Sequence, residues 1–536
     1  MKNKEPLNKS CIPQWGLLLC HTIITPDIIH WNYAGLGTES DPFRVTWIQD
    51  IDPRDPLQFS KMRKACITAI VSLITLAVSF ISSTYAGCMA EIAREFEVAD
   101  EIVSLGIAVF VAGFAVGPLI WAPLSEVYGR QLVLFVTYGA LTAFNAASAA
   151  APNIQTLIVV RFFAGAFGSS SLTNSGAVLA DMYNARERGL ALAFFAAAPF
   201  MGPVLGPIVG GFLGQSHRGG WRWVLGLASI FTGTLWIFAA VFVPETYAPL
   251  LLRQRASKLS KLNGKVYVSN ADRDEPPKSV KHRLGVALTR PFKLLIFEPI
   301  VLLLSLYNSI IYGILYMFFG AMPIVYQEGR GWNEGQGGLA FLGILLGTIA
   351  AVLFIMLVNH RYQRAIDVKI ADGMSGKLPP EVRLLPSMLG GISVPVGLIW
   401  FAWTDYPSIN WMASIAAGVP FGFGMALIFT SINNYLVDSY VMYAASALAA
   451  NVVLRSAFAA GFSVFTPYMY GGAGIHWATM IPAFLALACT PLPFLFYWFG
   501  AKIRARCHYS ASARGLSRNP AMQSAPVSSR PGSENV

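Results

Sequence analysis

Apolar residues in this chain form runs of roughly 20, separated by shorter polar segments, from residue 64 almost to the C-terminus. A helix needs such a run to cross the ~30 Å hydrocarbon core of a bilayer. The pattern therefore predicts an all-α polytopic membrane protein with twelve transmembrane helices. Their expected limits are residues 64–86, 103–124, 131–151, 155–178, 189–214, 222–243, 298–320, 336–358, 385–403, 409–432, 440–470 and 477–500.

The longest polar segment between these runs, Pro244 to Lys293, separates the sixth run from the seventh and predicts two six-helix bundles. A short internal echo supports a duplication, because LADMY at the end of the fourth run is similar to LVDSY at the end of the tenth. Many secondary transporters consist of two such repeats. The expected divisions are a cytoplasmic N-terminal tail at 1–63, a first bundle at 64–243, a central cytoplasmic loop at 244–293, a second bundle at 294–501 and a cytoplasmic C-terminal tail at 502–536.

Charge is scarce but strongly unbalanced. The chain is 55% hydrophobic and 12% charged, yet its net charge is +11. If the runs cross alternately from a cytoplasmic N-terminus, 33 of the 39 Lys and Arg residues fall on the inner side and four on the outer side. This asymmetry follows the positive-inside rule, so the charge reports topology and gives no reason to expect a nucleic-acid partner. The expected location is the plasma membrane, with the vacuolar membrane as the alternative, and both termini in the cytoplasm.

Motifs for metal, phosphate and hydrolytic chemistry are absent from the sequence. The six cysteines form no CxxC pair, and the seven histidines lack the spacing of metal ligands. There is no GxxxxGK[ST] phosphate loop, no GxSxG and no HExxH. We therefore expect no enzymatic activity, no metal and no cofactor.

Polar residues within the runs concentrate in the first, fourth, seventh and tenth, which begin the successive triplets of spans. Hydroxyl and amide groups can join helices to one another, and this is the alternative interpretation of each cluster taken singly. Four clusters at a period of three spans favour a shared water-filled cavity, where tyrosines would suit bulky aromatic or cationic substrates. The expected cavity residues are Ser171, Asn174, Tyr307, Asn308, Tyr312, Tyr316, Asn433 and Asn434.

The stretch PFMGPVLGPIVGGFLG in the fifth run repeats proline and glycine at intervals of four. Glycines at that spacing form one smooth stripe along a helix, where a neighbouring helix can approach closely. Prolines remove backbone donors and bend the helix. Simple helix packing would also explain the stripe. The residues singled out for gating are Gly202, Pro203, Gly206, Pro207, Gly210 and Gly211.

Several motifs carry a family resemblance. GPVLGPIVGG in the fifth run resembles the antiporter motif of the major facilitator superfamily, which marks exporters. GPLIWAPLSEVYGRQ and LIVVRFFAGAFG resemble that superfamily's signatures at spans two to three and at span four. DPFRVTWIQDIDPRDP, PETYAPLLLRQRA, FAWT, NNYLVDSY and SALAANVVLRSAF resemble the fungal twelve-span drug:proton antiporter family, so that the likeness covers roughly residues 41 to 500.

The resemblance assigns roles around the loop between spans two and three. Glu126 would oppose the positive N-terminal end of span eleven, which begins near Tyr440. Gly129 would permit the tight turn, and Arg130 would pair with a carboxylate such as Asp181 or anchor to lipid headgroups. Such an inner-face latch would hold the outward-open state. Departures from the general signature, at Ala122, Val127 and Gln131, imply fewer charge pairs. A loop that only sets topology is the alternative.

Two arginines fall inside the spans. Arg161 lies about six residues into span four, ~9 Å deep, and the resemblance makes it a coupling residue, although it could also snorkel outward. Arg455 lies near the middle of span eleven, one turn from Asn451. A mid-bilayer arginine is a functional candidate by default; bracing of the second bundle is its alternative role.

No carboxylate is expected at mid-membrane. The carboxylates nearest to the membrane all lie at inner ends of spans: Glu126, Asp181, Glu298 and Asp438. The sequence therefore does not identify the residue that carries the proton, and proton coupling follows from the resemblance alone. The resemblance implies a monomeric exporter of amphipathic drugs, toxins or a secondary metabolite, driven by the proton gradient. A facilitator or proton symporter on the same fold is one alternative, and a non-transporting membrane receptor or scaffold is another.

Overall fold

A computed structural model describes residues 22, 24–48, 52, 54–215, 220–270, 280–371, 379–440 and 443–507 of the chain. Long helices dominate it. The first six-helix half, referred to below as the N-half, consists of α3 (Lys61–Thr84), continued through η2 (Tyr85–Cys88) into α4 (Met89–Phe96), then α5 (Asp100–Tyr128), α6 (Arg130–Ala149), α7 (Ile154–Met182), α8 (Ala185–Gly214) and α9 (Gly220–Phe242). The second, the C-half, consists of α12 (Pro299–Met322), η4 (Pro323–Glu328), α13 (Glu334–Leu339), α14 (Leu342–Ala371), η5 (Pro380–Leu384), α15 (Leu385–Thr404), α16 (Trp411–Ser439), α17 (Ala444–Cys489) and α18 (Pro491–Arg506).

Eleven helical segments of the described chain are long and apolar enough to cross a membrane. The last of them, Ala444–Arg506, has 63 residues, which at 1.5 Å per residue is about three times the thickness of a bilayer core. It is broken at Gly474, where φ is 73° and ψ is 163°. A single bend at this glycine divides the segment into two crossings, so the helices provide the twelve crossings that the hydropathy pattern predicts.

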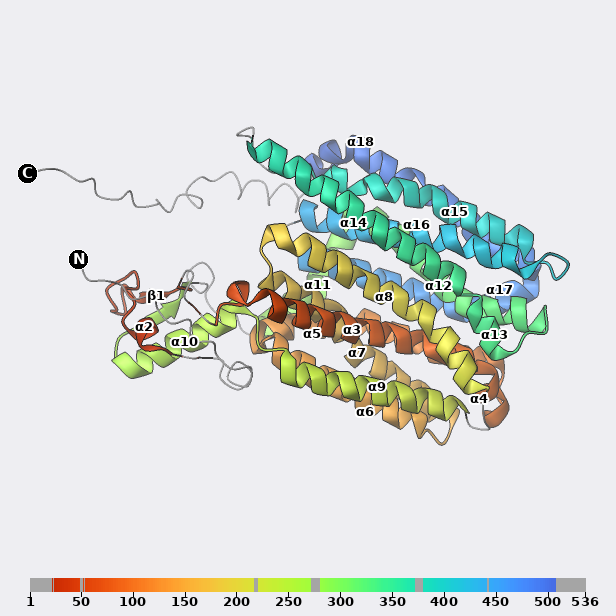
Figure 1. Cartoon of the computed structure of the whole chain (residues 1–536), viewed down its shortest axis with the longest axis horizontal. Coiled ribbons are helices and arrows are strands. Elements are labelled where there is room, and N and C mark those ends of the chain that lie inside the picture. Colours follow the sequence, from red (N-terminus) through yellow and green to blue (C-terminus); the bar gives the residue numbers. More distant parts are fainter. Residues whose placement is uncertain are drawn as a thin grey trace, which may run out of the picture.

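The two halves lie side by side with their helices along one common direction (Figure 1). The N-half contacts the C-half mainly through α5 with α17, α8 with α14, and α13, which packs on α8. Within the halves, α3 packs on α8 and α12 packs on α17. The main apolar core runs continuously through both halves, so the centre of the molecule is the boundary between them.

The two ends of the bundle differ in what they carry. One end, the proximal end, bears α10 (Ala248–Asn263) and two short strands, on the left of Figure 1. The other, the distal end, bears α4 and α13, on the right. The amphipathic α11 (Val280–Phe297) leads from the central loop into the C-half and packs on α5, α12 and α17.

A small unit at the proximal end combines two segments that the sequence analysis treats separately. Strand β1 (Phe43–Val45) of the tail pairs in parallel with β2 (Tyr267–Ser269) of the central loop. The short α2 (Pro26–Ile29) and η1 (Pro56–Gln58) complete the described part of the tail. The unit has its own apolar core, made by Ile28, Tyr33, Val45, Ile48, Leu252, Ala256 and Leu259.

A buried ion pair joins the tail to the loop inside this unit. Asp52 accepts two hydrogen bonds from the Arg255 guanidinium, at 2.5 and 3.0 Å, with both side chains almost wholly buried. Arg255 also lies over the Trp47 ring, 4.8 Å from its centroid. Because a buried charge is costly once its partner is lost, this pair requires both segments to be in place.

Candidate functional site

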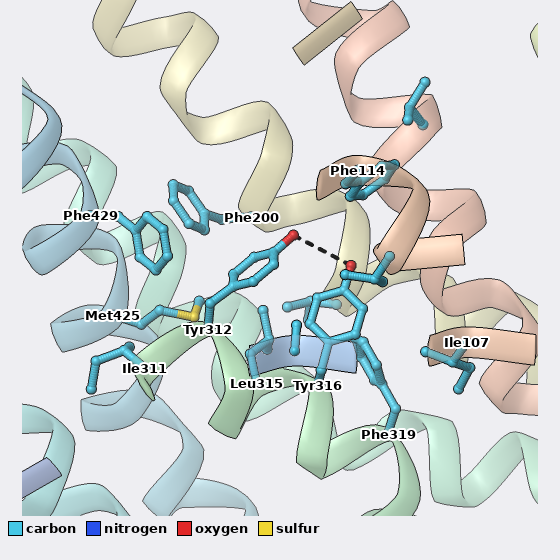
Figure 2. Packing of buried hydrophobic residues seen from close by; sticks show 14 of the residues in the cluster. Ile107, Phe114, Phe200, Ile311, Tyr312, Leu315, Tyr316, Phe319, Met425 and Phe429 are labelled. Carbon is cyan, nitrogen blue, oxygen red and sulfur yellow. Dashed lines mark hydrogen bonds between the residues drawn. The ribbon is translucent and has the colours of Figure 1, made fainter. Parts of the chain in front are cut away.

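An aromatic belt crosses the boundary between the halves at the centre of the molecule (Figure 2). Tyr312 and Tyr316, one turn apart on α12, have ring centroids 4.9 Å apart and hydroxyls 3.4 Å apart. The Tyr316 hydroxyl lies 2.8 Å from Ser82 Oγ on α3, in the N-half. On the other side, Phe429 of α16 contacts both Tyr312 and Phe200, the latter on α8 of the N-half.

Every member of the belt is buried, with relative exposures of 0 to 5%. Two of the eight residues expected to line a cavity, Tyr312 and Tyr316, are therefore at the boundary between the halves. Their hydroxyls lie among mostly apolar rings, and this combination suits the recognition of amphipathic molecules.

A chain of asparagines lies beside the belt in the C-half. Asn308 Nδ2 donates to Asn451 Oδ1 over 3.4 Å, and Asn451 Nδ2 donates to Asn433 Oδ1 over 2.7 Å. Asn308 Oδ1 is buried without a hydrogen-bond partner among the residues described. These residues come from α12, α17 and α16, so the seventh and tenth spans do bring polar groups together, and Asn451 joins them.

Other expected cavity residues are placed differently. Ser171 and Asn174 are buried in α7, where Ser171 Oγ donates to the Gly168 carbonyl and Asn174 Nδ2 donates to Ser170 Oγ. Tyr307 is buried with its hydroxyl toward α15, near Gly391. Asn434 is half-buried on α16. Their side chains are outside the belt and the asparagine chain.

Arg161 is fully buried in the N-half. Its Nε donates to the Gly106 carbonyl on α5 over 2.7 Å, and its guanidinium lies 4.2 Å from the Tyr85 ring centroid and 5.0 Å from that of Phe110. One terminal nitrogen is buried without a hydrogen-bond partner in the described chain. The side chain is thus turned into the bundle, and the alternative of snorkelling to the surface is excluded.

The proline and glycine segment of α8 packs on two neighbours at once. A Cβ added at Gly202, Gly206 or Gly210 would meet the backbone or side chains of α3. On another side, the backbone at Pro207 and Gly211 touches α13 of the C-half, so that a Cβ on Gly338 would lie 2.6 Å from the Pro207 carbonyl oxygen. The helix is continuous from Ala185 to Gly214 despite its three internal prolines, of which Pro203 is the middle one. The stripe confirms the close packing expected from the sequence, with its α3 side inside the N-half and its Pro207 and Gly211 side at the distal boundary between the halves.

Polar contacts reinforce this distal boundary. Arg94 of α4 donates to Glu334 Oε1 of α13 over 3.2 Å, and the Gly335 amide donates to Gln215 Oε1 over 3.2 Å. Both contacts join the N-half to the C-half. The sequence analysis did not single out Glu334 or Arg94, because they are 240 residues apart and belong to no motif.

At the proximal end, the loop between α5 and α6 is held by carboxylates of the N-half. Gly129 has φ of 96°, a conformation that residues with a Cβ rarely adopt, as the tight turn requires. Arg130 Nε lies 3.3 Å from Asp181 Oδ2, its Nη1 donates to Ser125 Oγ over 2.5 Å, and its guanidinium lies over the Tyr247 ring. The expected pairing of Arg130 with Asp181 is thus present in the structure.

Glu245 is a residue of this loop site that the sequence analysis missed. It is fully buried, and its carboxylate accepts hydrogen bonds from the backbone amides of Arg130, Gln131, Thr246 and Tyr247, at 2.8 to 3.1 Å. It therefore caps the N-terminus of α6, where amides lack partners. The signal was available, because Glu245 is the acid of the PETYAPLLLRQRA motif.

Glu126 makes no side-chain hydrogen bond or ion pair with the residues that the structure describes, and is half-buried at the end of α5. Close to Glu245, burial lowers the pKa of Arg54 to about 10, and the negative charge of the Glu245 carboxylate opposes this lowering. No group of three His, Cys, Asp or Glu residues close enough to hold a metal ion occurs in the described ranges.

A model of the Major Facilitator Superfamily matches residues 71–463. The chain belongs to the major facilitator superfamily. The MFS-type efflux pump MFS2 of Trichophyton rubrum is 56% identical over 94% of this chain and 83% of its own length. The major facilitator superfamily multidrug transporter mdrA of Aspergillus fumigatus is 54% identical over 97% of this chain and 85% of its own. The major facilitator-type transporter sorT of Penicillium rubens is 46% identical over 92% of this chain and 93% of its own length.

Solved structures agree with this membership at the level of the fold. The structure of the proton:xylose symporter XylE, bound to a halogenated glucose, superposes on this one with a TM-score of 0.60 at 16% sequence identity. The superposition covers 82% of this chain and 96% of the XylE chain. The superfamily fold therefore applies to the whole bundle, and the protein is a multi-pass membrane protein with efflux pumps among its relatives.

Proposed function

We propose that this protein exports amphipathic small molecules by rocking its two six-helix halves around the aromatic belt, in exchange for protons. The observation that carries the proposal is the position of the belt: Tyr316 of the C-half is hydrogen-bonded to Ser82 of the N-half, directly at the boundary where the halves must separate. Secondary transporters place their substrate site at such a boundary, near the bilayer midplane. The names of these relatives, efflux pump and multidrug transporter, support export of more than one compound.

The contacts at the two ends suit an alternating-access cycle. At the distal end, α8 and α4 contact α13 across the boundary. At the proximal end, the described ion pairs Arg130–Asp181, Arg383–Asp438 and Arg504–Glu381 each join residues of one half. The distal side is therefore closed, and opening it requires the contacts of α8 with α13 to break.

Orientation follows from the basic residues. With the proximal end in the cytoplasm, both termini lie inside and the Lys and Arg excess is on the inner side, as the positive-inside rule demands. Substrate would then enter from the cytoplasm and leave at the distal end. An exporter that detoxifies the cell must lie in the plasma membrane, and the vacuolar membrane is the alternative location. The protein works as a monomer, and the proton gradient is its energy source.

Transport by purified protein in liposomes tests the proposal. A panel of azoles, polyamines and aromatic toxins is loaded with and without an imposed proton gradient, and movement is compared between the wild type and Arg161→Ala. We expect gradient-dependent movement that Arg161→Ala abolishes while the melting temperature stays near that of the wild type. Movement that ignores the gradient would indicate a facilitator, and movement of solute along with protons would indicate a symporter; either result contradicts exchange.

A further inference from the structure

Arg455 is a buried cation without a counter-charge. It lies 11 residues into α17, about 17 Å from the proximal start of that helix, and its relative exposure is 8%. No hydrogen bond or ion pair joins it to any residue of the described chain, and its Nε is buried without a partner. A charged arginine near the bilayer centre is costly unless something compensates it.

The groups that surround Arg455 supply aromatic faces and neutral amides. Its guanidinium lies 4.8 Å from the ring centroid of Tyr312 and 5.6 Å from that of Phe429. Asn451, one turn earlier on α17, donates a hydrogen bond to Asn433, so that the nearest polar neighbour along the helix is a neutral amide that already has a partner. The carboxylates of the described spans are confined to their ends, so no protein anion reaches the site.

Arg455 contrasts with Arg161, the other arginine inside the spans. Arg161 is anchored by a 2.7 Å hydrogen bond to the Gly106 carbonyl, and the rings that it contacts, Tyr85 and Phe110, are rings of the N-half outside the belt. Arg455 has aromatic contacts alone, and both rings that it touches belong to the belt at the boundary. Arg455 therefore presents unpaired donors directly at the belt, where a molecule bound between the halves would lie.

We propose that the central site takes flat, conjugated molecules that carry an anionic oxygen, such as a carboxylate or a phenolate, and that Arg455 binds this oxygen. A guanidinium matches such an oxygen in both charge and fork geometry. The rings of Tyr312, Phe429 and Phe200 provide the walls for the conjugated part. This inference rests on the proposed export function, and it replaces the sequence-based expectation of cationic substrates, because the face of Tyr312 is already occupied by a cation.

Three matched fluorescent probes test this inference: anthracene-9-carboxylate, 9-(aminomethyl)anthracene and neutral 9-(hydroxymethyl)anthracene. Their binding is measured on the full-length protein in nanodiscs, with the wild type, Arg455→Gln and Arg455→Lys. We expect the wild type to bind the carboxylate about tenfold more tightly than the ammonium, a difference of ~1.4 kcal/mol. Arg455→Gln should abolish this preference and leave binding of the alcohol unchanged, whereas Arg455→Lys should retain part of the preference.

Two results would overturn the inference. One is a wild type that binds the ammonium as tightly as the carboxylate. The other is an equal loss of all three probes in Arg455→Gln at an unchanged melting temperature, which would make Arg455 a structural residue. Export of the neutral alcohol by the wild type in liposomes keeps the two proposals apart: if it persists while the charge preference is absent, the export function stands and the anion site falls.

Discussion

The two ends of the bundle are stabilised by different kinds of contact. At the distal end, the halves meet through backbone, because Gly211 and Pro207 of α8 lie directly against α13. The one ion pair that the described residues form across that boundary is largely exposed on the side of Arg94. At the proximal end, buried carboxylates hold the loops of each half, as Glu245 does for the start of α6.

This difference in contacts indicates that the distal end is suited to movement between the halves and the proximal end to rigidity within each half. Backbone contact between small residues has no strong bonds to break and depends only on shape, so a boundary made of it can open and close at low cost. Charged caps and ion pairs fix local geometry, so they suit a half that must move as one body. We therefore expect substitutions in the glycine contacts of α8 to affect transport and substitutions of the proximal carboxylate cap to affect stability.

The largest effect is expected for Gly206→Ala. A Cβ there would overlap Ser83 Oγ and lie 2.7 Å from the Phe80 carbonyl oxygen, so α8 would be pushed from α3. Overpacking of this kind costs about 1–3 kcal/mol, and we expect transport in liposomes to be nearly lost. The control is Gly226→Ala on α9, where an added Cβ meets no atom within 4 Å of it and transport should be unchanged. Equal transport by the two variants would refute the assigned role of the α8 stripe.

The next effect is expected for Glu245→Gln. The variant loses the negative charge of the carboxylate, which accepts hydrogen bonds from four backbone amides. Its side-chain NH₂ group would then face backbone N–H groups, which are also donors. Hydrogen bonds to a charged group contribute about 1.5–3 kcal/mol, so the melting temperature of the purified protein should fall clearly. Glu39→Gln, at an exposed position of the tail, serves as the control and should leave the melting temperature unchanged. A melting temperature of Glu245→Gln equal to that of the control would contradict the claim that Glu245 stabilises the loop between α5 and α6.

A smaller, pH-dependent effect is expected from Asp405, in the distal loop after α15. Burial raises its pKa from 3.8 to about 6, opposed by His476 and Arg330. Because the folded state holds this proton more tightly than the unfolded state, the contribution favours folding at low pH and is lost as the pH rises through about 6. Asp405→Asn should therefore raise the melting temperature at pH 8 relative to the wild type and change it little at pH 4. An equal shift at both pH values would contradict the raised pKa.

The smallest effect is expected for Arg94→Gln. The Arg94 side chain is 75% exposed in its pair with Glu334, and exposed ion pairs contribute about 0–1 kcal/mol. We expect transport within the error of the wild type at physiological salt. A large loss would mean that this pair, rather than the backbone contact of α8 with α13, holds the distal boundary.

Much of the fold could be predicted from the sequence. Apolar runs of membrane length fix the number of crossings, since a bilayer admits few other structures, and only the bend at Gly474 hides the boundary between the last two. The pairing of Arg130 with Asp181 was accessible because both belong to recognisable motifs. The α8 stripe was accessible because spacing by four defines one helix face.

The remaining features depend on tertiary structure. The seventh run carries tyrosines on more than one side of its helix, so the sequence could not show that Tyr312 faces the belt while Tyr307 faces α15. Contacts such as Asp52–Arg255 and Arg94–Glu334 join residues more than 200 positions apart. The coupling and gating roles assigned to Glu126, Arg161, Arg455 and the α8 stripe stay predictions.

The account depends most on the distal boundary opening between the halves. Its most direct test is the distance between spin labels at Asp100→Cys on α5 and Ser408→Cys in the loop before α16, two exposed distal positions of different halves, in a background without native cysteines. In nanodiscs, we expect a second, longer distance population to appear when a transported compound is added or the pH is lowered, while a control pair within the N-half, Asp100→Cys with Ala150→Cys, keeps one distance. A single distance for the first pair under every condition, from protein that still transports, would contradict the account.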